Sequence, residues 1–238
     1  MAEIKMKPFE FKYFTLHQSP LVMKVSTDSI LLGSWAKAGS AKTILDIGTG
    51  TGILALLLAS KSNAKIDALD ISKAAIQTAE SNFKNNIWAS NMRVFNSSLQ
   101  HFSSQEKYDI IISNPPYFEE AILSPKQEKS MARNQAGLSF KELIHYTALL
   151  LQKSGSAYFC FPSKSEESIT QYAEKSALFF KKKMYVRSFQ NQAPYLVLAE
   201  LGFVEYETQT EHLVIYTSEK KYTAEFIELT KESYGVRF

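Results

Sequence analysis

The sequence has little cysteine and little histidine. Among its 238 residues it holds one cysteine, Cys160, and four histidines that are scattered along the chain. A disulfide within the chain is therefore excluded, and we expect a reducing compartment. No histidines and cysteines stand at the spacing of metal ligands, so we predict no bound metal. Cys160 lies in an apolar stretch, which favours a small core residue over a nucleophile.

Long apolar runs are missing as well. No stretch approaches the roughly 20 apolar residues that span a bilayer. Residues 1–11 alternate charged and apolar side chains and lack the apolar core of a signal peptide. We therefore expect a cytoplasmic protein with no membrane partner. A Walker-type Gly-Lys-Ser/Thr loop and a clear Ser-His-Asp arrangement are also missing, which argues against the chemistries that depend on them.

The overall composition is that of an ordinary globular protein. Hydrophobic residues make up 45% of the chain and charged residues 21%, and the formal net charge is +3. This weak basic balance is compatible with a polyanionic partner but does not demonstrate one. The length suits a single domain. We expect one domain over residues 1–238, with an extension (1–40), a core (41–204) and a C-terminal strand and helix (205–238).

Strand and helix patterns alternate through the core. Strands are predicted at residues 43–47, 65–70, 92–96, 107–113 and 155–161, and helices at 53–61, 72–83, 138–151 and 163–178. Repeated strand–helix units place helices on both faces of a mostly parallel sheet. The fold class is therefore α/β with a doubly wound sheet.

Further elements are predicted on either side of this core. Residues 9–25 suggest two short strands joined by a turn at 17–20, and Thr27 and Asp28 predict the start of a helix that ends near Gly39. Toward the C-terminus the patterns predict a hairpin of residues 181–187 and 194–203, a last strand at 212–216 and a last helix at 223–234.

A glycine-rich loop follows the first core strand. It reads Asp46-Ile47-Gly48-Thr49-Gly50-Thr51-Gly52, and glycines permit positive φ and let a ligand approach the backbone. The next strand ends in Asp70, where a carboxylate can bind ribose hydroxyls. Dinucleotide folds usually show Gly-x-Gly-x-x-Gly instead. The compact pattern with an acid in front suits a nucleoside that bears a cationic amino group, such as S-adenosylmethionine, better than NAD.

The segment Asn114-Pro115-Pro116-Tyr117 follows an apolar strand and is predicted to lie at the same sheet edge as the glycine loop. Two prolines supply carbonyl oxygens without matching N–H donors. An asparagine oxygen and a proline carbonyl can together accept both hydrogens of an NH₂ group, and Tyr117 offers a flat face for stacking. The segment therefore predicts a site for a flat, amine-bearing group.

Two charged stretches leave alternatives open. Residues 118–139 are polar and lack strong periodicity, which is typical either of a substrate-facing flap or of a solvated loop. Lys181-Lys182-Lys183 begins the predicted hairpin, where lysines usually form a solvated edge but can also contact nucleic acid.

Together these motifs resemble those of class I S-adenosylmethionine-dependent methyltransferases that act on exocyclic or amide NH₂ groups. Residues 24–35 are similar to the N-terminal signature of the bacterial tRNA(Val) adenine-37 N6-methyltransferase family, and residues 122–125 and 222–234 also resemble that family. The resemblance implies a Rossmann-like, mostly parallel sheet of seven strands, with a C-terminal antiparallel hairpin and a short N-terminal hairpin and helix. It also implies transfer of a methyl group from S-adenosylmethionine to N6 of adenine 37 in tRNA(Val). We expect a monomer.

The motifs and the resemblance give the candidate site residues. Asn114, Pro115 and Tyr117 are the candidate catalytic residues. We expect the cofactor to be bound by Lys24, Thr27, Asp46, Gly48, Gly50, Gly52, Asp70, Ser97 and Asn114, and the substrate RNA by Phe118, Lys126, Lys129 and Arg133. The resembling family commonly carries an Asp near Ser97 that accepts from the cofactor's adenine amine. Only the neutral side chains of Asn96, Ser97 and Ser98 stand there in this chain.

Other functions share parts of this pattern. Methylation of protein glutamine uses the same four-residue motif, but those enzymes usually carry a sizeable helical domain ahead of the glycine loop. DNA adenine methyltransferases often need a large recognition domain after the motif. A non-catalytic RNA-binding protein could keep the fold, although the intact Gly48, Asp70 and Asn114 argue against that alternative.

Overall fold

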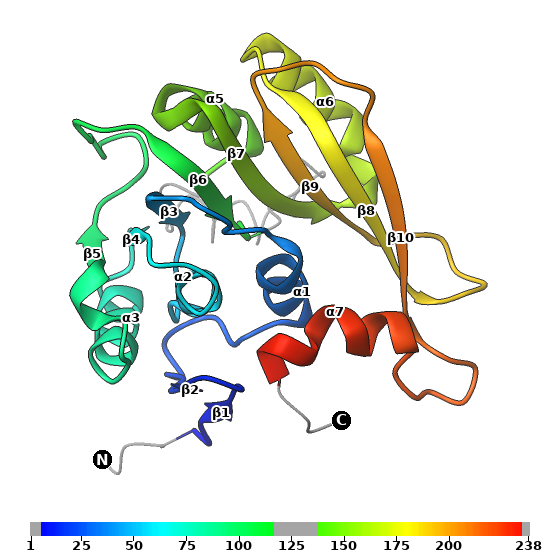
Figure 1. Ribbon diagram of the computed structural model, residues 1–238, viewed down its shortest axis with the longest axis horizontal. Coiled ribbons are helices and arrows are strands. Elements are labelled where there is room, and N and C mark those ends of the chain that lie inside the picture. The colour runs from blue at the N-terminus through cyan, green and yellow to red at the C-terminus, as the bar shows by residue number, and fades with distance from the viewer. Residues whose placement is uncertain (1–5, 117–137, 235–238) are drawn as a thin grey trace, which may run out of the picture.

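Eight strands form one large sheet (Figure 1). The computed structural model describes residues 6–116 and 138–234. The parallel part of the sheet contains β3 (Thr43–Ile47), β4 (Lys65–Asp70), β5 (Met92–Asn96), β6 (Tyr108–Ser113) and β7 (Leu151–Pro162). Its order is β7-β6-β3-β4-β5, so the chain winds outward in both directions from β3 and β6. This confirms the predicted doubly wound α/β sheet.

A further group of strands extends the sheet beyond β7. The antiparallel strand β9 (Leu196–Gly202) pairs with β7 and with β8 (Phe179–Phe189), which confirms the C-terminal hairpin. The last strand, β10 (Gln209–Tyr216), pairs in parallel with β8. The expected number of seven strands was therefore wrong, because β10 finds an unpaired edge on β8 and completes a sheet of eight strands.

Helices cover both faces of the sheet, because consecutive strand residues point to opposite sides. Ile110 and Ile112 belong to one core cluster and Ile111 to the other. The first cluster includes residues of α1 (Thr27–Trp35), α2 (Ile53–Ala59), α3 (Lys73–Lys84) and α7 (Ala224–Tyr234). The second includes residues of α5 (Phe140–Leu150) and α6 (Glu166–Lys175). Short 3₁₀ turns, η1 (Ala89–Asn91) and η2 (Ser163–Ser165), complete the described elements.

The N-terminal elements differ in detail from the sequence prediction. The strands β1 (Phe9–Glu10) and β2 (Thr15–Leu16) pair in an antiparallel hairpin, whose turn lies at residues 11–14 rather than at 17–20. Stacking of Phe11 on Phe14 favours the earlier turn, because both rings are buried there. Helix α1 is capped by Ser26, whose side chain accepts from the backbone N–H of Ser29, and not by Thr27 or Asp28.

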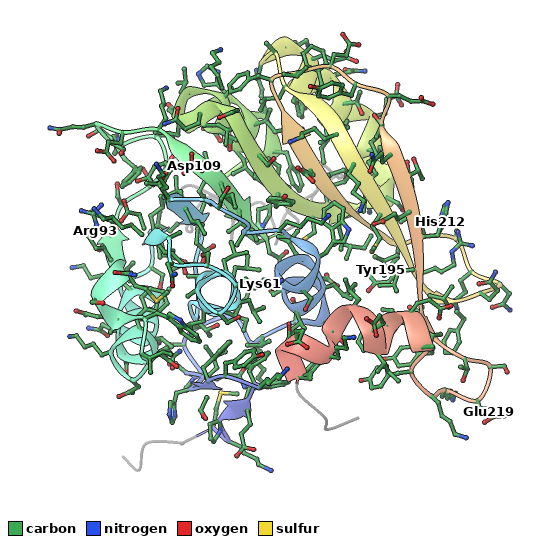
Figure 2. All side chains as sticks on the ribbon, viewed as in Figure 1. Lys61, Arg93, Asp109, Tyr195, His212 and Glu219 are labelled. Carbon is green, nitrogen blue, oxygen red and sulfur yellow. The ribbon has the colours of Figure 1, made fainter. Side chains whose placement is uncertain are left out.

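Buried contacts fix α1 against the rest of the fold. The helix ends at Trp35 rather than near Gly39, and Lys61 lies between it and α2 (Figure 2). The Lys61 Nζ atom donates to the carbonyl oxygens of Gly33 and Ser34, each at 2.7 Å. Carbonyls in the last turn of a helix lack partners within the helix, so an ammonium group there satisfies them. Burial lowers the pKa of Lys61 to about 8.

Candidate active site

The carboxyl ends of the central parallel strands meet at one edge of the sheet. There β3 delivers the glycine loop, β4 delivers Asp70, β5 delivers Asn96 and β6 delivers Asn114. The Ser113 hydroxyl donates to the carbonyl oxygen of Ile47 at 2.8 Å, which ties the last residues of β6 and β3 together. In open α/β sheets this edge holds the ligands. The predicted cofactor loop and the predicted catalytic motif therefore lie on neighbouring strands.

Most N–H groups of the glycine loop are already used within the protein. Those of Gly48 and Thr49 donate to the carbonyl oxygen of Leu69, and that of Gly52 donates to the carbonyl oxygen of Thr49. The Gly50 N–H donates to the Asp70 carboxylate at 3.0 Å. Phosphate-binding loops instead point several N–H groups at the anion. This loop is thus unsuited to a pyrophosphate, which favours a nucleoside cofactor without phosphate.

The three loop glycines have different physical roles. All adopt left-handed backbone angles, with φ of 69° at Gly48, 56° at Gly50 and 85° at Gly52. A Cβ added at Gly48 would meet nothing within 4 Å, and one at Gly50 would meet only Val22 at 3.9 Å. A Cβ at Gly52 would lie 2.5 Å from Cε1 of Phe83. The loop therefore presents an open backbone surface at Gly48 and Gly50, whereas Gly52 permits close packing on α3.

Asp46 is fully buried at the end of β3. Its Oδ2 atom accepts from the Thr49 hydroxyl at 2.6 Å and from the Ala55 N–H at 3.2 Å, so the carboxylate joins the loop to the first turn of α2. Its Oδ1 atom is buried and has no hydrogen-bond partner among the residues that the structure describes. Burial raises the pKa of Asp46 to about 7, and the nearby charge of Asp70 adds to the rise. Direct contact of Asp46 with a ligand stays a prediction.

Asp70 organises the neighbouring loops. Its Oδ2 atom accepts from Gly50, and its Oδ1 atom accepts from the Ser72 N–H at 2.8 Å. Ser72 caps α3, as the sequence predicted. Each carboxylate oxygen can accept more than one hydrogen bond. The same carboxylate therefore has acceptor capacity for ribose hydroxyls while it holds the loop.

Asp70, at the end of β4, is flanked by polar side chains from the end of β5 and by the apolar residue that follows it in the sequence. The Asn96 amide nitrogen donates to the carbonyl oxygens of Asp70 and Ile71, each at 3.0 Å, which leaves its oxygen as the acceptor for other donors. The Ser97 hydroxyl donates to the Ser98 carbonyl and keeps its oxygen as an acceptor. Ile71 is 57% exposed directly after Asp70. Sequence reasoning missed Ile71. An apolar residue directly after a strand-terminal acid could have indicated an apolar surface for a base.

Asn114 is held from two sides by residues distant in sequence. Its amide nitrogen donates to the Ser29 hydroxyl at 2.7 Å and more weakly to the Ser26 hydroxyl at 3.4 Å. Its Oδ1 atom accepts from the Cys160 thiol at 3.0 Å. A carboxamide oxygen has two lone pairs, so this contact does not by itself prevent acceptance from a substrate amine. Sequence reasoning missed all three neighbours, because nothing local relates α1 or β7 to this motif.

The segment ahead of α1 spans the distance between the glycine loop and Asn114. Val22 lies beside Gly50, and Ser26 lies beside Asn114. Lys24 lies between Val22 and Ser26 in the sequence, Thr27 directly follows Ser26, and both are exposed. Their contact with a cofactor stays a prediction. Asp28 accepts from the Tyr195 hydroxyl at 3.4 Å, which adds the start of β9 to this neighbourhood.

Several predicted site residues lie outside the described residues, namely Tyr117, Phe118, Lys126, Lys129 and Arg133. Pro115 is buried directly after Asn114. The lysine run of β8 lies within the described part, and each of its members pairs with a carboxylate: Lys181 with Glu200, Lys182 with Glu211 and Lys183 with Glu166. These pairs favour the structural reading of that run over nucleic-acid contact.

Within residues 6–116 and 138–234 no group of three or more His, Cys, Asp or Glu side chains could hold a metal ion. Within the same ranges no helix is both long enough and apolar enough to cross a membrane.

Comparison with known proteins gives consistent matches. Residues 24–158 match the Methyltransferase small domain family. The tRNA1(Val) (adenine(37)-N6)-methyltransferase of Phocaeicola vulgatus is 35% identical over 226 residues, which cover 95% of this chain and 97% of that protein. The enzyme of the same name from Tolumonas auensis is 37% identical over 228 residues, with 95% and 96% covered.

Solved structures share the fold. A predicted O-methyltransferase from Agrobacterium tumefaciens superimposes with a TM-score of 0.65 at 16% identity, covering 89% of this chain and 99% of that one. A ribosomal protein L11 methylase from Lactobacillus delbrueckii gives a TM-score of 0.56 at 21% identity, covering 79% and 84%. At these identities the likeness concerns the fold alone.

Proposed function

Since the chain belongs to the tRNA1(Val) (adenine(37)-N6)-methyltransferase family, within the Methyltransferase small domain group, we propose that its substrate is adenine 37 of tRNA(Val). The observation that carries the proposal is the placement of Asn114 beside an open glycine loop at one sheet edge. We propose further that the enzyme acts in the cytoplasm. Action as a monomer stays a prediction.

The residues at the sheet edge fit S-adenosylmethionine as the methyl donor. The backbone at Gly48 and Gly50 is open, and the N–H groups of the loop already donate to acceptors within the protein rather than pointing at an anion. Asp70 can accept further hydrogen bonds from ribose hydroxyls. Asn96 and Ser97 present oxygen acceptors suited to an adenine amine, and Ile71 presents an apolar face. When bound, this cofactor supplies an activated methyl group on a sulfonium centre.

Asn114 is the central group for the chemistry. The N6 lone pair of adenine is delocalised into the ring, which makes the amine a poor nucleophile. In the proposed mechanism, Asn114 Oδ1 and the Pro115 carbonyl oxygen accept the two N6 hydrogens and hold the nitrogen in the geometry for attack. These acceptors also stabilise the positive charge that develops on N6 as the new bond forms. No strong general base is required, because the proton can leave to water after the transfer.

The substrate base must leave its stack before it reaches Asn114. Tyr117, with Phe118, is proposed to stack on the extruded adenine, a contact worth about 1 to 3 kcal/mol in other single-stranded complexes. Lys126, Lys129 and Arg133 are proposed as phosphate contacts from the same stretch of chain. In this mechanism the four-residue motif binds the adenine base, and the segment that follows it binds the phosphate backbone of the RNA.

The proposal is tested with labelled S-adenosylmethionine and separate tRNA, DNA and protein fractions from cells that lack this gene. We expect labelled N6-methyladenine in tRNA. Label in protein alone would overturn the proposal and favour glutamine methylation. Binding of the cofactor without transfer to any RNA would favour a non-catalytic role.

Replacing Asn114 by alanine tests the mechanism. Loss of a preorganised group that stabilises developing charge typically costs about 100- to 1,000-fold in kcat. We expect Asn114→Ala to lose turnover on this scale while it still binds S-adenosylmethionine, as measured by calorimetry. The exposed Asn85, which follows α3, offers a matched control, and Asn85→Ala should keep full turnover. Unchanged turnover in Asn114→Ala would refute the mechanism.

A further inference from the structure

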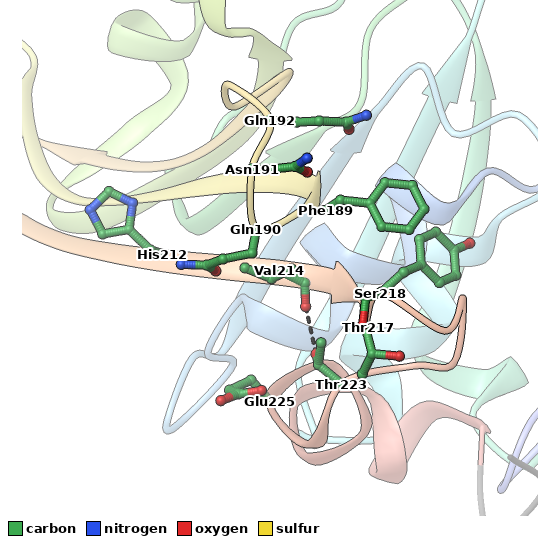
Figure 3. A pocket seen from close by; sticks show the side chains of 11 residues that line it. Phe189, Gln190, Asn191, Gln192, His212, Val214, Thr217, Ser218, Thr223 and Glu225 are labelled. Carbon is green, nitrogen blue, oxygen red and sulfur yellow. Dashed lines mark hydrogen bonds between the residues drawn. The ribbon is translucent and has the colours of Figure 1, made fainter.

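A second concave site lies at the far end of the sheet from β5. It is a cavity of about 900 Å³ between the turn after β8, the end of β10 and the start of α7 (Figure 3). Its lining includes Phe189, Gln190, Asn191, Gln192, Tyr216 and Glu225. We call this cavity the outer pocket. Nothing in the mechanism above uses it.

The outer pocket lies at the same sheet edge as Asn114. Strand β9 is antiparallel to both β7 and β8, so β8 runs in the direction of β7, and β10 runs parallel to β8. The carboxyl ends of β8 and β10, at Phe189 and Tyr216, therefore reach the edge where β6 ends in the catalytic motif. One continuous edge carries both sites.

The lining combines flat rings with amide groups. The Phe189 and Tyr216 rings lie 5.6 Å apart between centroids, and Tyr216 stacks on Tyr222 at 5.3 Å. Figure 3 shows Gln190, Asn191 and Gln192 following one another on the turn above the pocket, and all three are exposed. Their side-chain amides make no hydrogen bond to the described part of the chain. Rings that stack and amides that both donate and accept are the groups that proteins use to hold unpaired nucleobases.

The charge of the lining favours a base over a phosphate. Glu225 is the acidic member of the lining, in the first turn of α7, and none of the described residues that line the pocket is a lysine or an arginine. An anion would be repelled there, whereas a carboxylate can accept from base amino groups. Thr217 and Ser218 add hydroxyls that suit either edge of a base. The lining therefore fits a neutral, flat and hydrogen-bonding ring.

Tyr195 links the outer pocket to the catalytic motif. Its hydroxyl donates to Asp28, whose neighbours Ser26 and Ser29 hold Asn114. Burial, followed by the charge of Asp28 and the hydrogen bond to it, raises the pKa of Tyr195. Figure 2 shows Tyr195 toward α1. Tyr195 is 39% exposed.

The separation of the sites matches a short stretch of RNA. Three strand spacings separate β6 from β8 across β7 and β9, which is about 14 Å at about 4.8 Å each. The register sets Asn114 level with Met184, so Phe189 lies five residues further along the strands, which adds about 17 Å at about 3.3 Å per residue. The two sites are therefore about 22 Å apart, a span that stacked nucleotides cover in about six or seven steps, at roughly 3.4 Å each, and extended nucleotides in fewer.

We propose that the outer pocket binds an unpaired nucleobase of the RNA substrate, about three to seven nucleotides from the methylated adenine. This inference rests on the proposed function, because it names a second contact with the same substrate. The site would raise affinity for a structured RNA loop and leave the chemical step and cofactor binding untouched.

The test compares full-length tRNA with a five-nucleotide RNA that has the target adenine in its centre. The variants are Phe189→Ala, which truncates a half-buried ring, and the double variant Asn191→Ala/Gln192→Ala, whose two side chains are exposed and can change without loss of folding. Loss of one stacked base at about 1 to 3 kcal/mol corresponds to about five- to 150-fold in KM. We expect increases of this size with tRNA, little change with the short RNA, and an unchanged Kd for S-adenosylmethionine. Gln77→Ala, an exposed change on α3, is the matched control.

A cross-link gives an independent readout. A photoreactive phenylalanine at position 191 should join to a nucleotide in the same loop as the methylated adenine. A KM for tRNA within twofold of wild type in both variants, or a cross-link confined to another arm of the tRNA, would overturn the inference. If the wild type methylates no tRNA, the proposed function fails first. Fluorescence anisotropy with labelled tRNA then decides the inference, which an equal Kd for wild type and both variants would refute.

Discussion

At the scale of single residues, the orientation of Asn114 depends on α1. The amide nitrogen of Asn114 donates to Ser29, so the oxygen side faces β7, where Cys160 donates to it. A free asparagine side chain would sample both orientations about its last torsion. We therefore propose that Ser29 is a positioning residue, which sets the direction of the Asn114 oxygen without touching the substrate.

Replacement of Ser29 by alanine tests this role. The variant removes one acceptor of a hydrogen bond worth about 1 kcal/mol, and we expect kcat to fall about fivefold. The KM for S-adenosylmethionine should stay unchanged, and Ser29→Thr, which restores the hydroxyl, should recover most of kcat. Ser34→Ala on the same helix breaks the hydroxyl contact with Ser233 and serves as the control. Equal kcat values for Ser29→Ala and Ser34→Ala would contradict a positioning role.

The titration of Asp46 predicts a pH dependence of stability. Burial raises its pKa from 3.8 to about 7, so between these values the folded chain holds a proton that the unfolded chain has released. The free energy of unfolding should therefore fall as the pH rises through this window, by at most about 1.4 kcal/mol per pH unit. This contribution is fully present below pH 3.8 and lost above about pH 7.

Urea unfolding of wild type and Asp46→Asn between pH 4 and 7 isolates this effect, because the other carboxyl groups titrate equally in both proteins. The difference between the two stability curves should change with pH in the stated direction. Parallel curves would show that Asp46 does not titrate in this window in the folded protein.

At the scale of elements, two glycines of the loop are required for different reasons. Gly52 allows packing against Phe83, whereas Gly48 leaves space that a ligand can occupy. Gly52→Ala combines left-handed strain of about 1 to 2 kcal/mol with a clash against Phe83 that adds about 1 to 3 kcal/mol. Gly48→Ala carries the strain alone, because its Cβ would meet open space. We expect Gly52→Ala to lose roughly twice as much stability as Gly48→Ala in urea unfolding.

Cofactor binding distinguishes the loop from other left-handed glycines. Gly39 also has positive φ and open space, but it lies outside the loop. Gly39→Ala and Gly48→Ala should therefore lose similar stability, while only Gly48→Ala should weaken binding of S-adenosylmethionine in calorimetry. Wild-type affinity in Gly48→Ala would show that the open surface at this glycine does not face the cofactor.

At the scale of the whole molecule, one buried cluster contains residues of the extension, the core and the C-terminal part. It contains Phe11 and Ile30 from the extension, Ile44 from the core, and Leu213 and Phe226 from the C-terminal part. The backbone N–H of Lys12 also donates to the carbonyl oxygen of Ser233 at 2.8 Å. Segments that share a core are expected to unfold together. That residues 1–238 form a single domain stays a prediction, which this cluster supports.

Thermal unfolding tests the single domain. We expect one transition, with a calorimetric enthalpy equal to the van't Hoff enthalpy. The tryptophan fluorescence, which comes from Trp35 on α1 and from Trp88, should change together with the far-ultraviolet circular dichroism of the sheet and helices. Two separated transitions, or a fluorescence change that precedes the loss of secondary structure, would show that the extension or the C-terminal part unfolds by itself.

The sequence by itself determined the elements that depend on neighbouring residues. Glycine spacing located the loop, apolar runs located the parallel strands, and Ser72 located the start of α3, because backbone conformation and capping are local properties. The order of strands and helices then placed Asp70 and Asn114 at one edge, since carboxyl ends of parallel strands share an edge.

Only the tertiary structure decided which distant side chains meet. Ser29 lies 85 residues from Asn114 in the sequence, and no pattern within either segment indicates their contact. The pairing of the lysine run with carboxylates, the place of β10 beside β8 and the outer pocket likewise arise from packing between segments far apart in the chain. Such contacts depend on how the hydrophobic faces of whole elements pack, which local sequence does not encode.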